Sequence, residues 1–222
     1  MTPLDFISKV HTRTPRDYFK ERVLGSDKAA CAARAKKFGV DYWDGDRKYG
    51  YGGYSYDGRW RPVAEKLAKH YRLKAEGRVL DIGCGKGYLL YEVTRVVPGA
   101  QVTGIDISRY AIRHAKEEIK KNLRHGNATH LPFKDRTFDL VVSINTLHNL
   151  YVYDLKKAVQ EIERVGKGKA KYIVVDSYRN EREKMNLMYW QLTCECFYTP
   201  KEWGWLLREF GYTGDFGCIY YE

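Results

Sequence analysis

Residues 79–88 read Val-Leu-Asp-Ile-Gly-Cys-Gly-Lys-Gly-Tyr, an apolar run that ends in three glycines with one residue between each pair. The run Arg78–Ile82 predicts a buried strand, and the apolar spacing from Tyr88 to Val97 predicts a helix. Glycines at such a turn let backbone N–H groups and the helix N-terminus come close to a ligand, and they tolerate a positive φ. The stretch therefore predicts a ligand-binding turn at the end of a strand.

Strand and helix patterns alternate on both sides of this turn. The chain is typical of an α/β fold with a doubly wound, mainly parallel sheet and right-handed crossovers. Further strands are predicted at Gln101–Asp106, Phe138–Ile144, Lys171–Asp176 and, as a short last strand, Phe216–Tyr221. Helices are predicted at Pro62–Tyr71, Ser108–Asn122, Asp154–Val165, Glu181–Thr193 and Pro200–Phe210.

The length and composition fit one domain. The chain has 222 residues, of which 44% are hydrophobic and 30% charged, so it has enough apolar material for a core. Residues 1–60 are interpreted as an N-terminal extension and lid of that domain, with short helical patterns between Asp5 and Phe38 and an aromatic, glycine-rich loop from Asp41 to Trp60. Residues 61–222 form the α/β unit, with an insert at about 178–200.

Several classes of protein are disfavoured by the sequence. No stretch approaches the roughly 18 apolar residues of a membrane-spanning helix, and the first residues lack the apolar run of a secretory signal. Five irregularly spaced cysteines fit a reducing compartment, so a cytoplasmic protein without membrane contact is expected. No metal is expected, because Asp41, Asp44 and Asp46 lack the spacing of a calcium loop and Cys194-Glu195-Cys196 lacks a second pair.

The net charge is strongly positive. The sequence has 39 Lys and Arg against 28 Asp and Glu, a balance of +11, with a pI near 9.3. Such a molecule attracts anions, but the basic residues are dispersed. The charge therefore does not choose between nucleic acid, a phosphorylated or nucleotide-linked small molecule and an acidic membrane surface.

Two carboxylates accompany the glycine turn. Asp106 ends the next predicted strand, 106 − 87 = 19 positions after Gly87, and this spacing suits a carboxylate that holds a ribose diol. Asp81 lies where a negative charge would repel a pyrophosphate, so a cationic or amine-bearing ligand fits better. The pair indicates a cofactor that contains a nucleoside.

From about Arg59 to Phe210 the sequence resembles the class I S-adenosylmethionine-dependent methyltransferases, which have a Rossmann-like fold. Asp81 and the three glycines match the family's first motif, and residues 126–139 are similar to its stretch beside the adenine. The general resemblance is to small bacterial members of metabolite and surface-polysaccharide pathways. The family often has Asp where this chain has Asn127, whose amide can still hydrogen-bond the adenine edge.

The resemblance implies S-adenosyl-L-methionine as cofactor and S-adenosyl-L-homocysteine as product. In the family the glycine loop passes the amino acid part of the cofactor, and the residue matching Asp106 binds the ribose hydroxyls. A small residue is needed at Cys84, which is preferred here to a reactive thiol. The residues expected to bind the cofactor are Asp81, Gly83, Cys84, Gly85, Gly87, Asp106, Ile107, Asn127, Ala128, Asn145, Tyr54 and Arg59.

The candidate catalytic stretch follows the predicted strand Phe138–Ile144. The motif Asn/Asp-Pro-Pro-aromatic of many amino-group methyltransferases is absent, and Leu147-His148-Asn149 is similar to the Leu-His-His of many small-molecule members. His148 is a candidate general base, because an imidazole with an ordinary pKa is mostly neutral at pH 7. A packing or hydrogen-bonding histidine is the alternative.

Aromatic residues outside the periodic segments are expected to bind the acceptor. The segment Asp41–Trp60 is the main candidate, with a hydrophobic cluster capping the sheet as its alternative. The insert Glu181–Pro200 could supply a second wall, complete the core or form a dimer contact. The residues expected to bind the acceptor are Trp43, Tyr56, Trp60, Asn149, Tyr151 and Trp190.

The resulting hypothesis is methyl transfer to a small acceptor, anionic or sugar-like, with oxygen as the first choice of attacking atom. An RNA methyltransferase is the second hypothesis, favoured by the charge alone. A catalytically silent subunit that binds the cofactor and partners another enzyme is the third. Only twelve residues follow Phe210, too few for the family's last hairpin, so the sheet is expected to expose an edge, and the chain to be a monomer or a homodimer.

Overall fold

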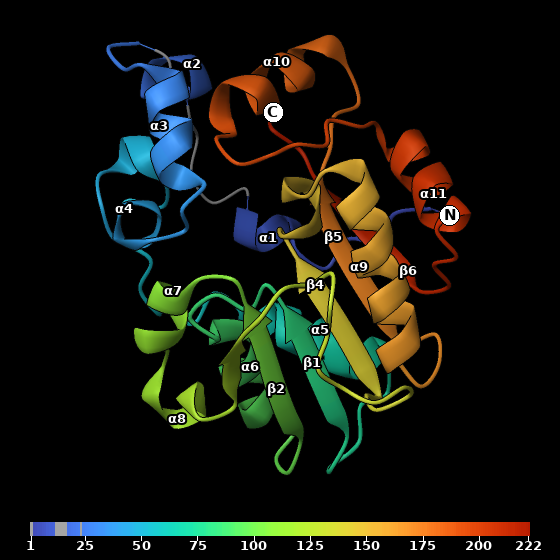
Figure 1. Ribbon diagram of the computed structural model, residues 1–222. Helices are drawn as coiled ribbons and strands as arrows, with labels where there is room; N and C mark the ends of the chain where they lie inside the picture. The colour runs from blue at the N-terminus through green and yellow to red at the C-terminus, as the bar shows by residue number, and fades with distance from the viewer. Residues whose placement is uncertain (1, 12–16, 23) are drawn as a thin grey trace.

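The computed structural model describes residues 2–11, 17–22 and 24–222. Its described residues form one six-stranded sheet with the order β3-β2-β1-β4-β5-β6, in which every neighbouring pair is parallel (Figure 1). The order reverses between β1 and β4, as in doubly wound folds. The strands are β1 (Arg78–Ile82), β2 (Gln101–Asp106), β3 (Leu123–His125), β4 (Leu140–Ile144), β5 (Lys171–Asp176) and β6 (Asp215–Ile219).

Helices cover both faces of the sheet, because successive strand residues point to opposite faces. Val79, Val142 and Val174 pack on one face against α5 (Arg61–His70) and α6 (Tyr88–Val96). Leu80 and Ile173 pack on the other against α9 (Val152–Val165) and α11 (Pro200–Glu209). The sheet is therefore buried on both sides. Within the described residues, no helix has the length and apolar character needed to cross a bilayer.

The remaining helices lie at the ends and edges of the sheet. Figure 1 shows α2, α3 and α4 on one side and α10 on the other, beyond the carboxyl ends of the strands, with α1 nearer the centre. The bounds are α1 (Ser8–His11), α2 (Tyr18–Arg22), α3 (Lys28–Ala35), α4 (Val40–Trp43), the 3₁₀ turns Arg47–Tyr49 and Leu147–Asn149, α7 (Arg109–Arg113), α8 (Glu117–Lys120) and α10 (Glu181–Trp190).

Strands β1, β2 and β5 begin and end where the sequence predicts. Helices α5, α6, α9, α10 and α11 lie at the predicted places within a few residues. The short helices expected between Asp5 and Phe38 are α1, α2 and α3, while residues 12–16 and 23 of that stretch lie outside the described residues. The loop expected from Asp41 to Trp60 contains the end of α4 and one 3₁₀ turn.

Two expectations about the elements are wrong, and one strand was missed. The helix predicted at Ser108–Asn122 is broken into α7 and α8, because the Lys116 N–H leaves the helix and donates to the Lys86 carbonyl of the glycine turn at 3.1 Å. β4 starts at Leu140, since Phe138 makes only a single bridge to Gly166. β3 was not predicted, because its three residues have one buried side chain and no apolar run.

The last strand, β6, pairs in parallel with β5, so the short last strand that the sequence predicts is present. The edge is not left open along its whole length. The Leu4 N–H donates to the Phe216 carbonyl of β6 at 2.7 Å, and the Tyr172 hydroxyl donates to the Leu4 carbonyl at 2.8 Å. The N-terminal residues of the same chain therefore cover part of the edge that the sequence predicts to be exposed.

Gly104 in β2 is a position where tight packing can be tested. A Cβ there would lie 2.6 Å from a Leu123 methyl carbon and 2.7 Å from the Cys84 sulphur. We predict that Gly104→Ala lowers the free energy of unfolding by about 1–3 kcal/mol, measured by urea denaturation. Thr103→Ala on the partly exposed neighbour should change it by about 0.5 kcal/mol or less, and equal effects would show that the contact does not matter.

Candidate functional site

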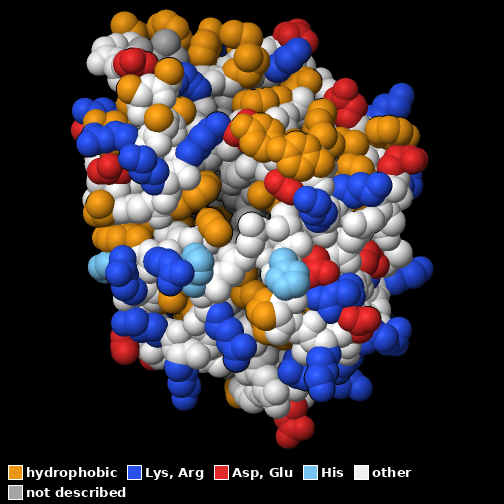
Figure 2. Space-filling view, in the orientation of Figure 1, with side chains coloured by type: hydrophobic (Ala, Val, Ile, Leu, Met, Phe, Trp, Pro, Cys, Tyr) orange, Lys and Arg blue, Asp and Glu red, His pale blue; other side chains and the backbone are white. Residues whose placement is uncertain are grey.

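A cavity of about 550 Å³ opens at the carboxyl ends of β1, β2 and β4. Its walls are the loops after these strands, residues from Phe38 to Trp60, residues 190–193 and the end of the chain near Tyr221. Figure 2 shows this face hollowed between apolar side chains, with Lys and Arg spread over the rest of it. Because ligands of doubly wound folds bind at this edge of the sheet, the cavity is the candidate site.

The glycine turn between β1 and α6 forms the floor. Gly83 and Gly85 have φ values of +80° and +55°, a region that favours glycine. A Cβ on Gly83 would lie 1.9 Å from the Thr146 hydroxyl, and a Cβ on Gly85 would lie 2.7 Å from the Trp43 ring. The backbone of the turn is thus in contact with two other walls of the cavity.

Two carboxylates face the turn from β1 and β2. Asp106 accepts the Gly85 N–H and the Ser108 N–H, each at 2.7 Å, so its position is fixed by backbone bonds. Asp81 is buried, and this burial, with the negative charge of Asp106, raises the pKa of Asp81 to about 8. A buried carboxyl with a raised pKa gains from a cation placed beside it.

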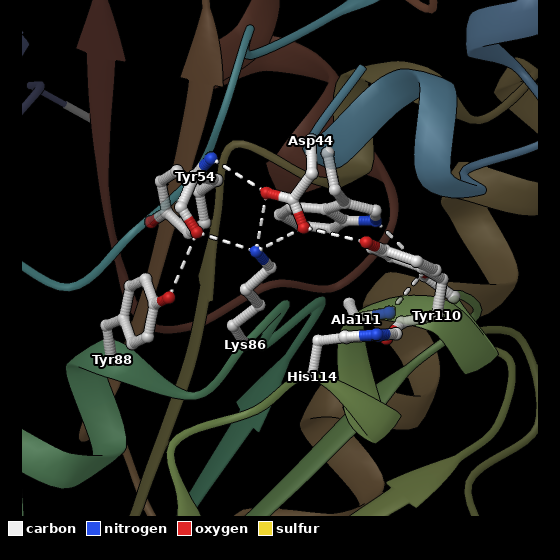
Figure 3. Close-up of polar contacts among 9 residues, drawn as sticks. Asp44, Tyr54, Lys86, Tyr88, Tyr110, Ala111 and His114 are labelled. Carbon is white, nitrogen blue, oxygen red and sulfur yellow. Dashed lines mark hydrogen bonds and ion pairs between the residues drawn. The ribbon is translucent and has the colours of Figure 1, made fainter.

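An ion pair holds the N-terminal segment onto the turn. Figure 3 shows the Lys86 ammonium between Asp44 and the carbonyl of Tyr54, with 2.7 Å to both carboxylate oxygens and to the carbonyl. The Tyr110 hydroxyl also donates to Asp44 at 2.9 Å. Burial raises the pKa of Asp44, but the bonds from Lys86, the Tyr54 N–H and Tyr110 outweigh it and lower the pKa below its usual value. This charged clamp ties the lid to the glycine turn.

Aromatic rings line the inner surface of the lid. Trp43 stacks on Tyr51 with 5.3 Å between ring centroids, and its indole N–H donates to the Ser108 hydroxyl at 2.9 Å. Tyr54 stacks on Tyr88 of α6 at 5.1 Å. Residues 41–60 are therefore a packed wall of the cavity.

His148 lies behind the cavity wall. It is 1% exposed, its Nδ1 accepts the Asp176 N–H at 3.1 Å, and its Nε2 is 3.4 Å from the Asp176 carboxylate. Burial lowers the pKa of His148, although Asp176 opposes this, so the ring is neutral at pH 7. Because His148 is not among the cavity-lining residues, the geometry favours a hydrogen-bonding role for His148 over that of a general base.

Most of the predicted site residues line the cavity. Gly87 does not, because it is the N-cap residue before α6 and is packed beneath Ile119. Tyr56 turns outward to Glu92, and Tyr151 is 53% exposed and stacks on Tyr153. The predicted residues on the cavity wall are Asp81, Gly83, Cys84, Gly85, Asp106, Ile107, Asn127, Ala128, Asn145, Tyr54, Arg59, Trp43, Trp60, Asn149 and Trp190.

Several residues of the site were missed. Lys86 could have been noticed, because a cation inside a glycine turn beside acidic residues suggests an ion pair. Gln191 and Tyr221 line the cavity but come from irregular parts of the sequence with no motif. Among the described residues, no three His, Cys, Asp or Glu side chains are grouped to hold a metal ion.

Comparisons with known proteins identify the class of this fold and site. The family model described as "Methyltransferase domain" matches residues 73–211, well over half of the chain. An uncharacterized protein of Methanocaldococcus jannaschii is 39% identical over 109 residues, 49% of this chain and 44% of its own length. A demethylmenaquinone methyltransferase of Lactiplantibacillus plantarum is 34% identical over 127 residues, 53% of this chain and 51% of its own.

The solved structure of YcgJ from Bacillus subtilis has the same fold, with a TM-score of 0.54, 22% identity and 66% of each chain covered. The chain therefore belongs to the class I S-adenosylmethionine-dependent methyltransferases, a family of enzymes with a Rossmann-like fold. The chain spans about half the length of the curated relatives it matches.

The clamp between Asp44 and Lys86 predicts how fast a ligand leaves. Asp44→Asn removes a charged partner of the buried Lys86 and should loosen the lid by roughly 1.5 kcal/mol. We expect S-adenosylhomocysteine to dissociate about tenfold faster, measured by stopped-flow displacement. Lys48→Met, which breaks an exposed pair with Asp46 in the same segment, should leave the rate unchanged. Equal rates for wild type and Asp44→Asn would exclude the clamp.

Proposed function

We propose that this chain transfers a methyl group from S-adenosylmethionine to a small acceptor bound in the same cavity. The observation that carries the proposal is the convergence of the glycine turn, Asp81 and Asp106 on one cavity that has room left beyond them. A cavity of a few hundred Å³ with an apolar wall and a few polar groups is typical of a small-molecule site.

The residues present fit the cofactor. The buried Asp81 would hold the ammonium of its amino acid part, since a cation beside this carboxyl offsets the cost of its ionisation. Asp106 would hold the ribose hydroxyls, with its orientation already set by Gly85 and Ser108. Asn127 accepts from the Thr129 N–H and hydroxyl through Oδ1, which leaves its amide N–H groups for the adenine edge.

Bound S-adenosylmethionine would supply an electrophilic methyl group, which an atom of the acceptor would take as the carbon–sulphur bond breaks, with the electron pair left on sulphur and the acceptor's proton lost to water when the product leaves the site. The chain's own contribution is to hold the acceptor and to exclude water. The aromatic lid covers the site, and rings such as those of Trp43 and Tyr54 stabilise a cation near their faces.

Oxygen remains our first choice of attacking atom. With His148 behind the wall, the proposed rate enhancement comes from positioning, because holding two reactants in line removes much of the entropic barrier. For RNA, the second hypothesis, the observation in favour is the net charge of +11 of the whole chain. On the face that Figure 2 shows, Lys and Arg side chains are spread out and interspersed with Asp and Glu. A silent partner subunit is the third.

A labelling experiment tests the proposal. The protein is incubated with methyl-labelled S-adenosylmethionine and cell extract, with and without ribonuclease, and the labelled products are separated by size. We expect label in small molecules that resists ribonuclease. Ribonuclease-sensitive label in large material would establish the RNA function instead. Cofactor binding without any labelled product would support the silent subunit.

The raised pKa of Asp81 predicts a pH dependence of cofactor binding. With a pKa of about 8, the free protein holds this carboxyl protonated at pH 7, and an ammonium ligand requires its ionised form. Binding of S-adenosylhomocysteine should therefore release a proton, and its affinity should fall by up to about tenfold for each pH unit below 8.

Calorimetry in two buffers of different ionisation enthalpy measures this proton release. Asp81→Asn should abolish the release and weaken binding. Asp139→Asn is the control, because Asp139 is at the opposite end of the sheet, and bonds from the Arg78 N–H and Lys167 lower its pKa despite partial burial. An affinity that stays constant between about pH 6 and pH 8 would contradict the assignment of Asp81 to the ammonium.

A further inference from the structure

The wall at the end of α10 contains a polar group that the proposed cofactor contacts do not use. Gln191 follows α10 directly, and its side chain lines the cavity beside Leu192 and Thr193. Trp190, which precedes it, lines the same wall. Because this wall comes from the insert and not from the glycine turn, its polar groups face the part of the cavity left for the acceptor.

The amide of Gln191 has a fixed orientation. Its Nε2 donates to one Asp176 carboxylate oxygen and, at 3.1 Å, to the Tyr221 hydroxyl oxygen. A carboxylate accepts hydrogen bonds and does not donate them, so the amide nitrogen must face Asp176. Within the described part of the chain, the amide oxygen of Gln191 accepts no hydrogen bond, and it is the group this side chain offers to the cavity.

Other elements hold this arrangement in place. The Lys28 ammonium of α3 donates to the backbone carbonyl of Gln191 at 2.6 Å, and the side-chain amide of Asn186 in α10 donates to the backbone carbonyl of Tyr221 at 2.9 Å. Two hydrogen bonds fix the backbone of Asp176 at the end of β5. The Asp176 N–H donates to His148 Nδ1, and the Asp176 carbonyl accepts the indole N–H of Trp203 at 3.0 Å. Gln191 therefore cannot turn its amide over without breaking bonds to Asp176.

Two asparagines add the same kind of group. Asn145, which follows β4, and Asn149 both line the cavity. Their Oδ1 atoms are buried and have no hydrogen-bond partner within the described residues, and the same holds for Oδ1 of Asp176. Buried oxygens without partners are costly unless a donor reaches them. The oxygens of Asn145 and Asn149 therefore favour a ligand that carries hydrogen-bond donors.

The cations that line the cavity have partners already. The Arg47 guanidinium donates to the Tyr51 carbonyl at 2.5 Å and lies over the Trp190 ring at 5.0 Å. Arg59 forms an ion pair with Asp57 at 2.7 Å. The ion pair offsets the charge of Arg59, and the Arg47 guanidinium is held against the Tyr51 carbonyl and the Trp190 ring.

We propose that the wall formed by Gln191 and Asn149 selects an acceptor through its N–H or O–H groups, an amine or an alcohol, and rejects carboxylates and phosphates. Asp176 is a positioning residue in this scheme, because it acts through Gln191. The inference rests on the proposed methyl transfer and narrows its acceptor: a sugar-like acceptor stays within the proposal, and an anionic acceptor does not.

Three probes with one aromatic frame test the selection: phenethylamine, 2-phenylethanol and phenylacetate. Each is titrated by calorimetry into protein saturated with S-adenosylhomocysteine. We expect the amine or the alcohol to bind about tenfold or more tightly than phenylacetate, because a site built from acceptor oxygens rejects a ligand without donors. The stronger of the two donor probes distinguishes an amine acceptor from an alcohol acceptor.

Asp176→Asn tests the positioning role. The asparagine can donate to the Gln191 amide oxygen, so the amide can turn and offer its N–H groups to the cavity. The preference for donor probes should then fall to about threefold or less, or reverse, with unchanged affinity for S-adenosylhomocysteine. Asn180→Ala is the matched control: it removes the N-cap of α10 and destabilises the same helix without touching Gln191, so the preference should persist.

Each outcome bears on one proposal. If S-adenosylhomocysteine does not bind to the wild-type protein, the proposed function fails. If it binds, but phenylacetate binds as tightly as the donor probes or none of the three binds, the donor-selective wall is wrong and the methyl-transfer proposal stands. A preference that Asp176→Asn and Asn180→Ala reduce equally would show that Asp176 only supports the fold.

Discussion

The turn from β1 into α6 has no room for side chains at the glycines, and the rest of the site is arranged around that constraint. Thr146 after β4 and Trp43 of the lid both touch the backbone of the turn, at places where a Cβ would lie 1.9 Å and 2.7 Å away. Because no side chains project from these glycines, the loop after β4 and the N-terminal segment can both contact the backbone of the turn. Lys86, the long side chain within the turn, is directed to Asp44 and secures the lid.

The electrostatics inside the cavity differ from those of the outer surface. The chain has a net charge of +11, yet Asp81 and Asp106 are buried at the floor and Asp176 lies behind the far wall. Burial makes an isolated carboxylate costly and raises the pKa of both groups: backbone N–H groups offset part of this cost at Asp106, and the pKa of Asp81 is raised to about 8. A basic surface therefore says little about the ligand, which meets local acids and amide oxygens.

Much of the fold could be predicted because it depends on short, continuous patterns. The strand Lys171–Asp176 is apolar over consecutive residues since both of its faces are covered, and its bounds were predicted correctly. The helix after Ser108 could not be predicted as two pieces, because a backbone bond from Lys116 to Lys86 interrupts it. Such a contact joins residues thirty positions apart and leaves no local signal.

By itself, the sequence determined the order of most strands and helices, the glycine turn and the two carboxylates that accompany it, since each follows from residues adjacent in the chain or one strand apart. Only the tertiary structure decided which side chains surround the cavity. In the structure, His148 lies behind the cavity wall, Tyr56 and Tyr151 point away from the cavity, and Gln191 and Tyr221 line it. The reason is that burial and hydrogen-bond partners depend on where distant segments meet, and local patterns do not encode those meetings.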